Sequence, residues 1–150
     1  MVESAGTDEV WLGVVGFDVF YEVSDCGRVR SLDRVRHSIN SYGKYSRIWP
    51  GRVLVLSVDR YGYEYLALTD AGGRSKHHKV HRLVAMAFIG KPPANRRCVN
   101  HIDFNKRNNS VANLEWCSES GNHRHAYRNG MHALNNYRCP ITGRMTGVKK

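Results

Sequence analysis

The chain has 150 residues, 41% hydrophobic and 24% charged, so it can build one ordinary domain or two small ones without a disulfide framework. Its 23 Lys and Arg residues against 13 Asp and Glu residues give a net charge of +10, which favours polyanionic partners, nucleic acid before an anionic membrane. No apolar run approaches the ~20 residues of a membrane-spanning helix, and four cysteines without a CxxC pair do not form a typical zinc site.

The charge is distributed unevenly along the chain. Residues 1–25 contain six acidic residues and no Lys or Arg, a net charge of −6, whereas the other 125 residues carry 23 basic and seven acidic groups, a net charge of +16. The acidic, polar N-terminus shows no signal-peptide pattern. We therefore expect reduced cysteines and a protein of the cytoplasm whose basic part contacts nucleic acid.

The first half of the chain predicts short strands. Apolar and aromatic side chains cluster over residues 11–32 on both sides of a turn at 24–27, which favours short strands around a tight turn. Residues 33–51 are polar and basic, and we expect a loop there that faces phosphate groups. The β-prone runs 52–58 and 63–68 are separated by Asp-Arg-Tyr-Gly, which predicts a hairpin connection.

The period of the sequence changes at Val80. Apolar residues recur at helical spacing over 80–88, so this segment is predicted to be a helix with one apolar face. Gly90 ends the helix, and the two prolines after it prevent its continuation.

Residues 96–130 predict a compact ββα unit. Two short strand candidates, 98–102 and 114–117, flank an Asn-rich loop at 104–112 that suits Asx turns. A serine-capped helix follows and stops near residue 130.

His101, Asn113 and Asn122 lie at positions of this unit that can converge on one point. Hydrolysis of a phosphodiester requires a base that activates water and a cation that stabilises the phosphorane and the leaving oxygen. A neutral imidazole can be the base, and Asn or His side chains can hold a hard divalent ion that keeps few protein ligands. The chemistry of a nuclease is therefore available in this unit.

The sequence VNHIDFNKRNNSVANLEW, followed by ESGNHRHA, resembles the HNH endonucleases of the ββα-metal class, particularly the phage and intron homing type. Upstream, VWLGVVGFDVFYEVSDCGRVRSL resembles the nuclease-associated modular domain that often precedes such nucleases, and VHRLVAMAFIG matches the helix that joins the two. The resemblance implies an α+β fold, with an N-terminal β-rich module and a linking helix followed by a ββα-metal (His-Me finger) nuclease unit.

The resemblance also implies the domain boundaries. We expect the nuclease-associated modular DNA-binding domain at 9–50, a β-hairpin plus the linking helix at 51–95, the HNH nuclease unit at 96–130 and a basic C-terminal tail at 131–150.

Each residue that matches the motif has a role implied by the resemblance. His101 is the expected general base, and Asn113 holds its strand in place and fixes the imidazole tautomer through its carbonyl. Asn122 is an expected metal ligand. Asn100 occupies the position of the other ligand, where the family often has Asp or His.

Two nearby residues have alternative roles. Asp103 lies on the same strand face as His101 and is either a reserve metal ligand or the cap of the following turn. His125 is a metal ligand, a phosphate contact or a cation at the helix C-terminus. Consecutive strand residues point to opposite faces, so Asn100 and His101 share a site only if the end of the strand twists or bulges.

These features predict a divalent-metal-dependent DNA endonuclease, encoded by a phage or a mobile element, that hydrolyses phosphodiester bonds by nicking or double-strand cleavage. The alternative is a catalytically weak or inactive, sequence-tolerant DNA-binding protein on the same scaffold, an alternative left open by the neutral amides at positions 100 and 122. The expected cofactor is Mg²⁺, or else Mn²⁺ or another divalent cation.

The expected partner is double-stranded DNA, with no membrane and no small-molecule substrate, and either a monomer or a homodimer is compatible with the sequence. A phage-encoded enzyme would work in the cytoplasm of a bacterial host cell. The expected DNA-contacting residues are Arg28, Arg30, Arg34, Arg36, Lys44, Arg47, Arg74, Lys76 and Lys79.

Overall fold

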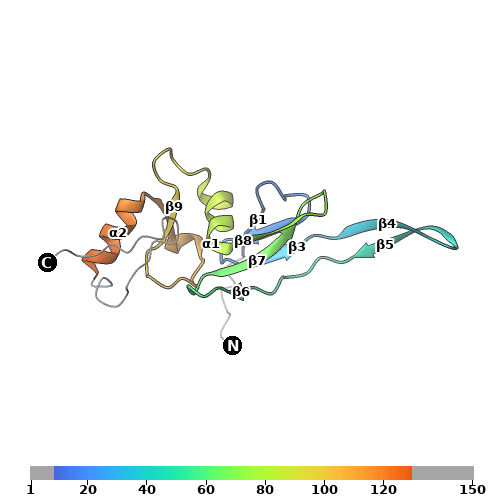
Figure 1. Ribbon diagram of the computed structural model, residues 1–150, viewed down its shortest axis with the longest axis horizontal. Helices are drawn as coiled ribbons and strands as arrows, with labels where there is room; N and C mark the ends of the chain where they lie inside the picture. Colours follow the sequence, from blue (N-terminus) through green and yellow to red (C-terminus); the bar gives the residue numbers. More distant parts are fainter. Residues whose placement is uncertain (1–8, 130–150) are drawn as a thin grey trace, which may run out of the picture.

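The computed structural model describes residues 9–129, with the exception of the side chain of Arg36. The predicted basic tail at 131–150, which includes Cys139, lies outside the described residues. The described chain is elongated, with a two-stranded hairpin at one end and helix α2 at the other (Figure 1).

A three-stranded antiparallel sheet begins the described chain, as the clustered apolar residues and the turn predicted. Its strands, in order across the sheet, are β1 (Trp11–Gly13), β2 (Tyr21–Ser24) and β3 (Val29–Ser31). Gly27 lies in the turn between β2 and β3 with a φ of 87°, a left-handed conformation that a residue with a Cβ atom rarely adopts.

The next segment is a long β-hairpin, so the prediction of a loop at 33–51 is wrong. Strands β4 (Arg34–Asn40) and β5 (Gly43–Trp49) pair with each other along their whole length. Every residue of β5 is exposed, and therefore the hairpin has no buried face whose apolar alternation would have identified a strand. In Figure 1 the hairpin projects away from the rest of the molecule.

A second antiparallel sheet leads into the linking helix. It consists of β6 (Ser57–Val58), β7 (Glu64–Thr69) and β8 (Ser75–Lys79), and its β6–β7 connection is the predicted hairpin. β8 runs directly into α1 (Val80–Val84), which continues as the π-helical segment η1 (Ala85–Ile89). The apolar spacing predicted this helix correctly, and Gly90 ends it with a φ of 92°.

The predicted ββα unit is present. Strands β9 (Cys98–His101) and β10 (Leu114–Cys117) form an antiparallel pair, and the loop between them ends in the 3₁₀ turn η2 (Val111–Asn113). Helix α2 (Glu119–Arg128) follows. Its first turn is capped by the Ser118 side chain, which accepts a hydrogen bond from the Gly121 backbone N–H at 3.0 Å.

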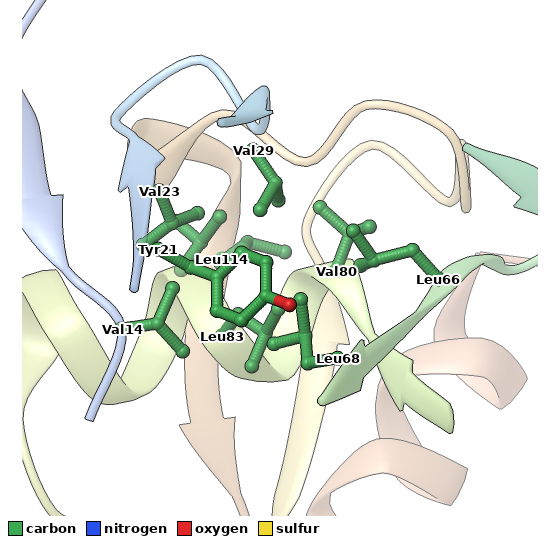
Figure 2. Close-up of a cluster of buried hydrophobic side chains, with 10 residues drawn as sticks. Val14, Tyr21, Val23, Val29, Leu66, Leu68, Val80, Leu83 and Leu114 are labelled. Carbon is green, nitrogen blue, oxygen red and sulfur yellow. The ribbon is translucent and has the colours of Figure 1, made fainter. Parts of the chain in front are cut away.

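One hydrophobic core connects the N-terminal sheets, the linking helix and the ββα unit (Figure 2). Its buried members are Val14, Tyr21, Val23, Val29, Leu66, Leu68, Val80, Leu83, Val84 and Leu114. Each such side chain contributes roughly 1.5–3 kcal/mol when it is buried. The core therefore holds these parts of the chain together, and the predicted α+β class is confirmed.

No disulfide joins the three cysteines of residues 9–129, which are Cys26, Cys98 and Cys117. Cys98 and Cys117 are cross-strand neighbours in the β9–β10 pair, and burial raises the pKa of Cys117 to about 11. Across residues 9–129, no helix combines the length and the apolar character needed to cross a membrane.

Candidate functional site

His101 is the last residue of β9, and only 5% of its surface is exposed. Its ring packs against two aromatic rings from other segments, with centroid distances of 5.2 Å to His81 of α1 and 6.0 Å to Tyr63. Burial lowers the pKa of the His101 imidazole below its usual value, which favours the neutral ring at physiological pH. The neutral ring is the form that can accept a proton.

The ring of His101 is hydrogen-bonded to Asn109, a residue of the Asn-rich loop. Nε2 of His101 lies 3.2 Å from Oδ1 of Asn109, which is 2% exposed. The motif predicts this contact for Asn113, and the structure places Asn109 there instead. The sequence does not identify Asn109 as a partner of His101, because Asn109 lies in a stretch of turn-forming residues and is expected to form an Asx turn.

Asn113 does hold the end of the His101 strand. Its backbone carbonyl accepts a hydrogen bond from the Ile102 N–H at 2.9 Å. Its side-chain amide donates to Oδ1 of Asp103 at 2.8 Å and to the backbone carbonyl of Asn108 at 2.9 Å. These bonds tie the two ends of the Asn-rich loop together beside His101.

Asp103 caps the turn that follows β9. Its carboxylate accepts hydrogen bonds from the backbone N–H of Asn105 at 2.8 Å and from the side-chain amides of Asn108 and Asn113 at 2.7 and 2.8 Å. The hydrogen bonds from Asn108 and Asn113 hold the pKa of Asp103 below its usual value. This arrangement matches the turn-capping alternative for Asp103.

Asn100 contacts a different set of residues from its neighbour His101, as the alternation of strand residues predicts. Its Nδ2 donates to Oε1 of Glu115 at 2.9 Å and lies 3.2 Å from Nδ1 of His125. The His125 ring stacks on Phe104 with centroids 4.4 Å apart. Asn122 precedes His125 by three residues and so lies on the same side of α2.

The predicted site residues therefore fall into two groups, one around His101 and one around Asn100. The regular β9–β10 register has no bulge that would turn these two side chains to the same face. We call Asn100, Glu115, Asn122 and His125 the ligand group. It offers amide and carboxylate oxygens and one imidazole nitrogen, a donor set that suits a divalent cation. Glu115 supplies the negative charge that the two amides lack. The donor set fits a bound metal ion once the Asn100 amide turns its Oδ1, in place of Nδ2, toward Glu115 and His125.

Glu115 was not predicted from the sequence. It joins the ligand group because the register of the β9–β10 pair places it opposite Asn100. The sequence does not define that register, because a long loop separates the two strands. The alternation of Leu114, Glu115 and Trp116 indicates only that Glu115 lies on the opposite face of β10 from its two buried neighbours.

Among the described residues, one group of three His, Cys, Asp or Glu side chains is close enough to share an ion. It consists of Glu9, Asp25 and Cys26, and Glu9 is already paired with the guanidinium of Arg28. The ligand group contains two such side chains, Glu115 and His125, beside its two amides.

Several of the predicted DNA-contacting cations are paired with carboxylates. Arg28 is paired with Glu9, Arg30 with Glu22 at 2.6 Å, Lys79 with Asp59, and Arg74 with Asp70 at 3.4 Å. Arg74 nevertheless leaves 82% of its side chain exposed. Pairing reduces the positive charge that the first three can offer to a phosphate.

The remaining predicted cations include the basic residues of the β4–β5 hairpin. Arg34, Lys44, Arg47 and Lys76 form no ion pair with a carboxylate of residues 9–129. The register places Arg34 opposite Trp49 and the backbone of Arg36 opposite Arg47, so these residues share one face of the hairpin. On that face the Arg47 guanidinium lies 5.5 Å from the centre of the Trp49 ring.

Two family models match successive parts of the chain. The family model described as HNH endonuclease matches residues 78–124, and the NUMOD4 motif matches residues 9–69. The chain contains an HNH endonuclease domain behind a NUMOD4 motif. Its HNH domain contains His101 and most of the ligand group, whereas its NUMOD4 motif contains the β4–β5 hairpin and Tyr63.

Individual HNH proteins match over longer stretches. HNH endonuclease L247 of Acanthamoeba polyphaga mimivirus is 34% identical over 97 residues, which are 64% of this chain and 24% of L247. DNA endonuclease I-HmuI of Bacillus phage SP01 is 32% identical over 112 residues, 75% of this chain and 54% of I-HmuI. The chain thus spans about a quarter of the first relative and about half of the second.

A solved structure of the HNH homing endonuclease I-HmuI, concerned with DNA binding and cleavage, superimposes on this chain with a TM-score of 0.63 and 30% identity. The match covers 84% of this chain and 61% of the I-HmuI chain. The similarity therefore extends over both the NUMOD4 motif and the HNH domain.

Proposed function

We propose that this chain is a divalent-metal-dependent DNA endonuclease that hydrolyses phosphodiester bonds in double-stranded DNA. The observation that carries the proposal is the buried imidazole of His101 at the end of β9, whose lowered pKa favours the neutral ring. The preceding residue of the strand, Asn100, belongs to the ligand group. The match of residues 78–124 to the HNH endonuclease family model supports the same chemistry.

In this proposal His101 is the general base. Its neutral ring accepts a proton from a water molecule that attacks phosphorus in line with the leaving oxygen. Asn113 maintains the strand end that carries His101, through its bonds to Ile102 and Asp103. The buried position of His101 supports this role because it keeps the ring neutral.

The ligand group would hold the metal ion, with Mg²⁺ or Mn²⁺ as the proposed cofactor. A bound divalent ion stabilises negative charge on the phosphorane and on the leaving oxygen. Asn100 and Glu115 are linked by a hydrogen bond, and His125 lies within 3.2 Å of Asn100, so three members are already close together. Asn122 would supply a further amide oxygen from the same side of α2.

DNA binding is proposed for the β4–β5 hairpin and the neighbouring cations. The hairpin face that carries Arg34, Arg47 and the backbone of Arg36 has positive charge without a carboxylate partner among the described residues. Arginine side chains beside aromatic rings suit phosphate and base contacts. A two-stranded ribbon also has the size that the major groove of DNA admits.

One relative supports a proposal about the biological setting. I-HmuI is a homing endonuclease of a Bacillus phage. We propose that this chain likewise belongs to a phage or mobile element and works in the cytoplasm of a bacterial host. A monomer with one site would nick one strand, and a homodimer could cut both.

The test is cleavage of a supercoiled plasmid that carries a library of random inserts, with Mg²⁺, Mn²⁺ or EDTA. We expect metal-dependent conversion to open circles or linear DNA, lost in His101→Ala and retained in His77→Ala, which removes an exposed imidazole of β8. Open circles without linear product indicate nicking.

Two results would contradict the proposal. Salt-sensitive DNA binding without cleavage in any metal would support the alternative, an inactive DNA-binding protein on the same scaffold. Cleavage that survives His101→Ala would show that another residue is the base.

A further inference from the structure

We propose that Glu64 and Asn109 are positioning residues that fix the tautomer of His101, so that its Nδ1 atom accepts the proton. The inference rests on the proposed role of His101 as the base. It gives the NUMOD4 motif, which contains Glu64, a direct part in the nuclease site.

The orientation of the Asn109 amide follows from its partner. Its Nδ2 donates to Oε2 of Glu64 at 2.8 Å. An ionised carboxylate only accepts hydrogen bonds, so the NH₂ group of Asn109 must face Glu64 and its Oδ1 must face His101.

The tautomer of His101 follows from that orientation. Oδ1 of Asn109 lies 3.2 Å from Nε2 of His101 and can only accept, so Nε2 must carry the hydrogen. A neutral imidazole has one N–H group, which leaves the lone pair on Nδ1. No hydrogen bond among residues 9–129 uses Nδ1 of His101, so this atom is available to a water molecule.

The surroundings prevent the amide from turning. Asn109 is 2% exposed, and the side chain of Glu64 is held from its other side by Arg107, whose Nε lies 3.6 Å from Oε1. Gly27 approaches so closely that a Cβ atom at this position would lie 2.6 Å from Cβ of Asn109. Glu64 and Gly27 both belong to the NUMOD4 motif, so this motif contacts Asn109 at two points.

The tautomer can be measured without any cleavage. Long-range ¹H–¹⁵N correlation spectra of protein labelled with ¹⁵N-histidine, recorded where the rings are neutral, distinguish the two forms. We expect the Nε2–H tautomer for His101 in the wild type. We expect a substantial Nδ1–H population in Glu64→Ala, because its Asn109 amide keeps only the longer hydrogen bond from Nδ2 to the Arg107 backbone carbonyl, at 3.5 Å.

Two further variants separate orientation from general damage. Glu64→Gln keeps an acceptor oxygen for the Asn109 amide, so most of the Nε2–H form should remain. Arg107→Ala removes the guanidinium but keeps the carboxylate, so it should leave the tautomer unchanged. Thermal unfolding of each variant reports whether the fold is retained.

Activity gives a second readout. We expect kcat of Glu64→Ala to fall between about 10- and 100-fold with little change in KM, and Glu64→Gln to recover most of that loss. A wild-type ring protonated on Nδ1, or a Glu64→Ala protein with unchanged tautomer and kcat, would overturn the proposal. Because the spectra need no substrate, a protein with the expected tautomer and no cleavage would refute the proposed function and leave the assignment of the tautomer standing.

Discussion

His81 is a buried histidine whose ring packs against that of His101. It is 7% exposed, its ring lies 5.1 Å from Tyr63 and 5.2 Å from His101, and its Nδ1 has no hydrogen-bond partner in the described chain. Burial, and after it the proximity of His101, lowers the pKa of His81 to about 3. A ring that is neutral at physiological pH therefore packs against the proposed base.

The protein should lose stability on acidification because of His81. In the unfolded chain His81 takes up a proton near pH 6.5, whereas in the folded protein it does so only at about 3. The unfolded state thus binds more protons between these values, and the free energy of unfolding falls as the pH decreases, by at most about 1.4 kcal/mol per pH unit for one such group.

The variant His81→Phe keeps an aromatic ring in this position but cannot titrate. We expect urea unfolding at a series of pH values below 6.5 to give a shallower loss of stability for His81→Phe than for the wild type. Equal slopes in the two proteins would show that His81 is not the group responsible.

At the scale of residues, the sequence identified those that follow a local motif. His101, Asn113 and the turn cap Asp103 lie close together in the chain, and their spacing defines the unit. Glu64 lies 45 positions before Asn109, and only the packing of β7 against the Asn-rich loop brings the two together. Contacts of that kind depend on tertiary structure and leave no local pattern.

At the scale of elements, the β4–β5 hairpin differs most from its prediction. Its exposed residues include Val35, Ile39 and Ile48 on one face, while Arg34 and Arg47 lie on the other. The helix at Val80 and the ββα unit were predicted because each buries one face, and burial is what creates a hydrophobic period. The β4–β5 hairpin buries neither face, and the exposed polar residues Lys44 and Ser46 interrupt its apolar face, so its hydrophobic period is weak.

The charged face of this hairpin should contribute to DNA affinity through phosphate contacts. Each contact that is lost should reduce the slope of log K against log salt concentration by about 0.9. We therefore expect Arg47→Gln to bind duplex DNA more weakly and with a shallower salt dependence, measured by fluorescence anisotropy over a salt series.

Ser38→Ala is the matched control for Arg47→Gln. Ser38 pairs with Tyr45 on the same hairpin face and carries no charge. The salt dependence of DNA binding by Ser38→Ala should therefore equal that of the wild type. An unchanged slope in Arg47→Gln would exclude this residue from the DNA contact.

At the scale of the whole molecule, the NUMOD4 motif and the HNH domain share one core. Val23, Val29 and Leu68 come from the motif, and Val80 and Leu114 come from the HNH domain (Figure 2). The Val111 N–H also donates to the backbone carbonyl of Asp25 at 2.8 Å, which joins the Asn-rich loop to the β2–β3 turn. The NUMOD4 motif and the HNH domain are separate segments of the sequence, but their side chains pack in one hydrophobic core.

A fragment that begins at residue 78 should therefore fail to fold. It would expose the α1 residues Val80, Leu83 and Val84, each of which loses the burial supplied by the N-terminal sheets. We expect low amide dispersion in the ¹H–¹⁵N NMR spectrum of this fragment and a well-dispersed spectrum for the full chain. A folded fragment would show that the HNH domain is independent of the motif.

The contact between Glu64 and Asn109 limits how such nucleases can exchange parts. A recombination event that places a new recognition module in front of this HNH domain also replaces the carboxylate beside Asn109. The chimera would acquire a new target preference together with an incorrectly oriented imidazole unless the incoming module carries an acceptor at the position of Glu64. Exchange of specificity and retention of catalysis are therefore coupled, and engineered fusions should transfer both residues together.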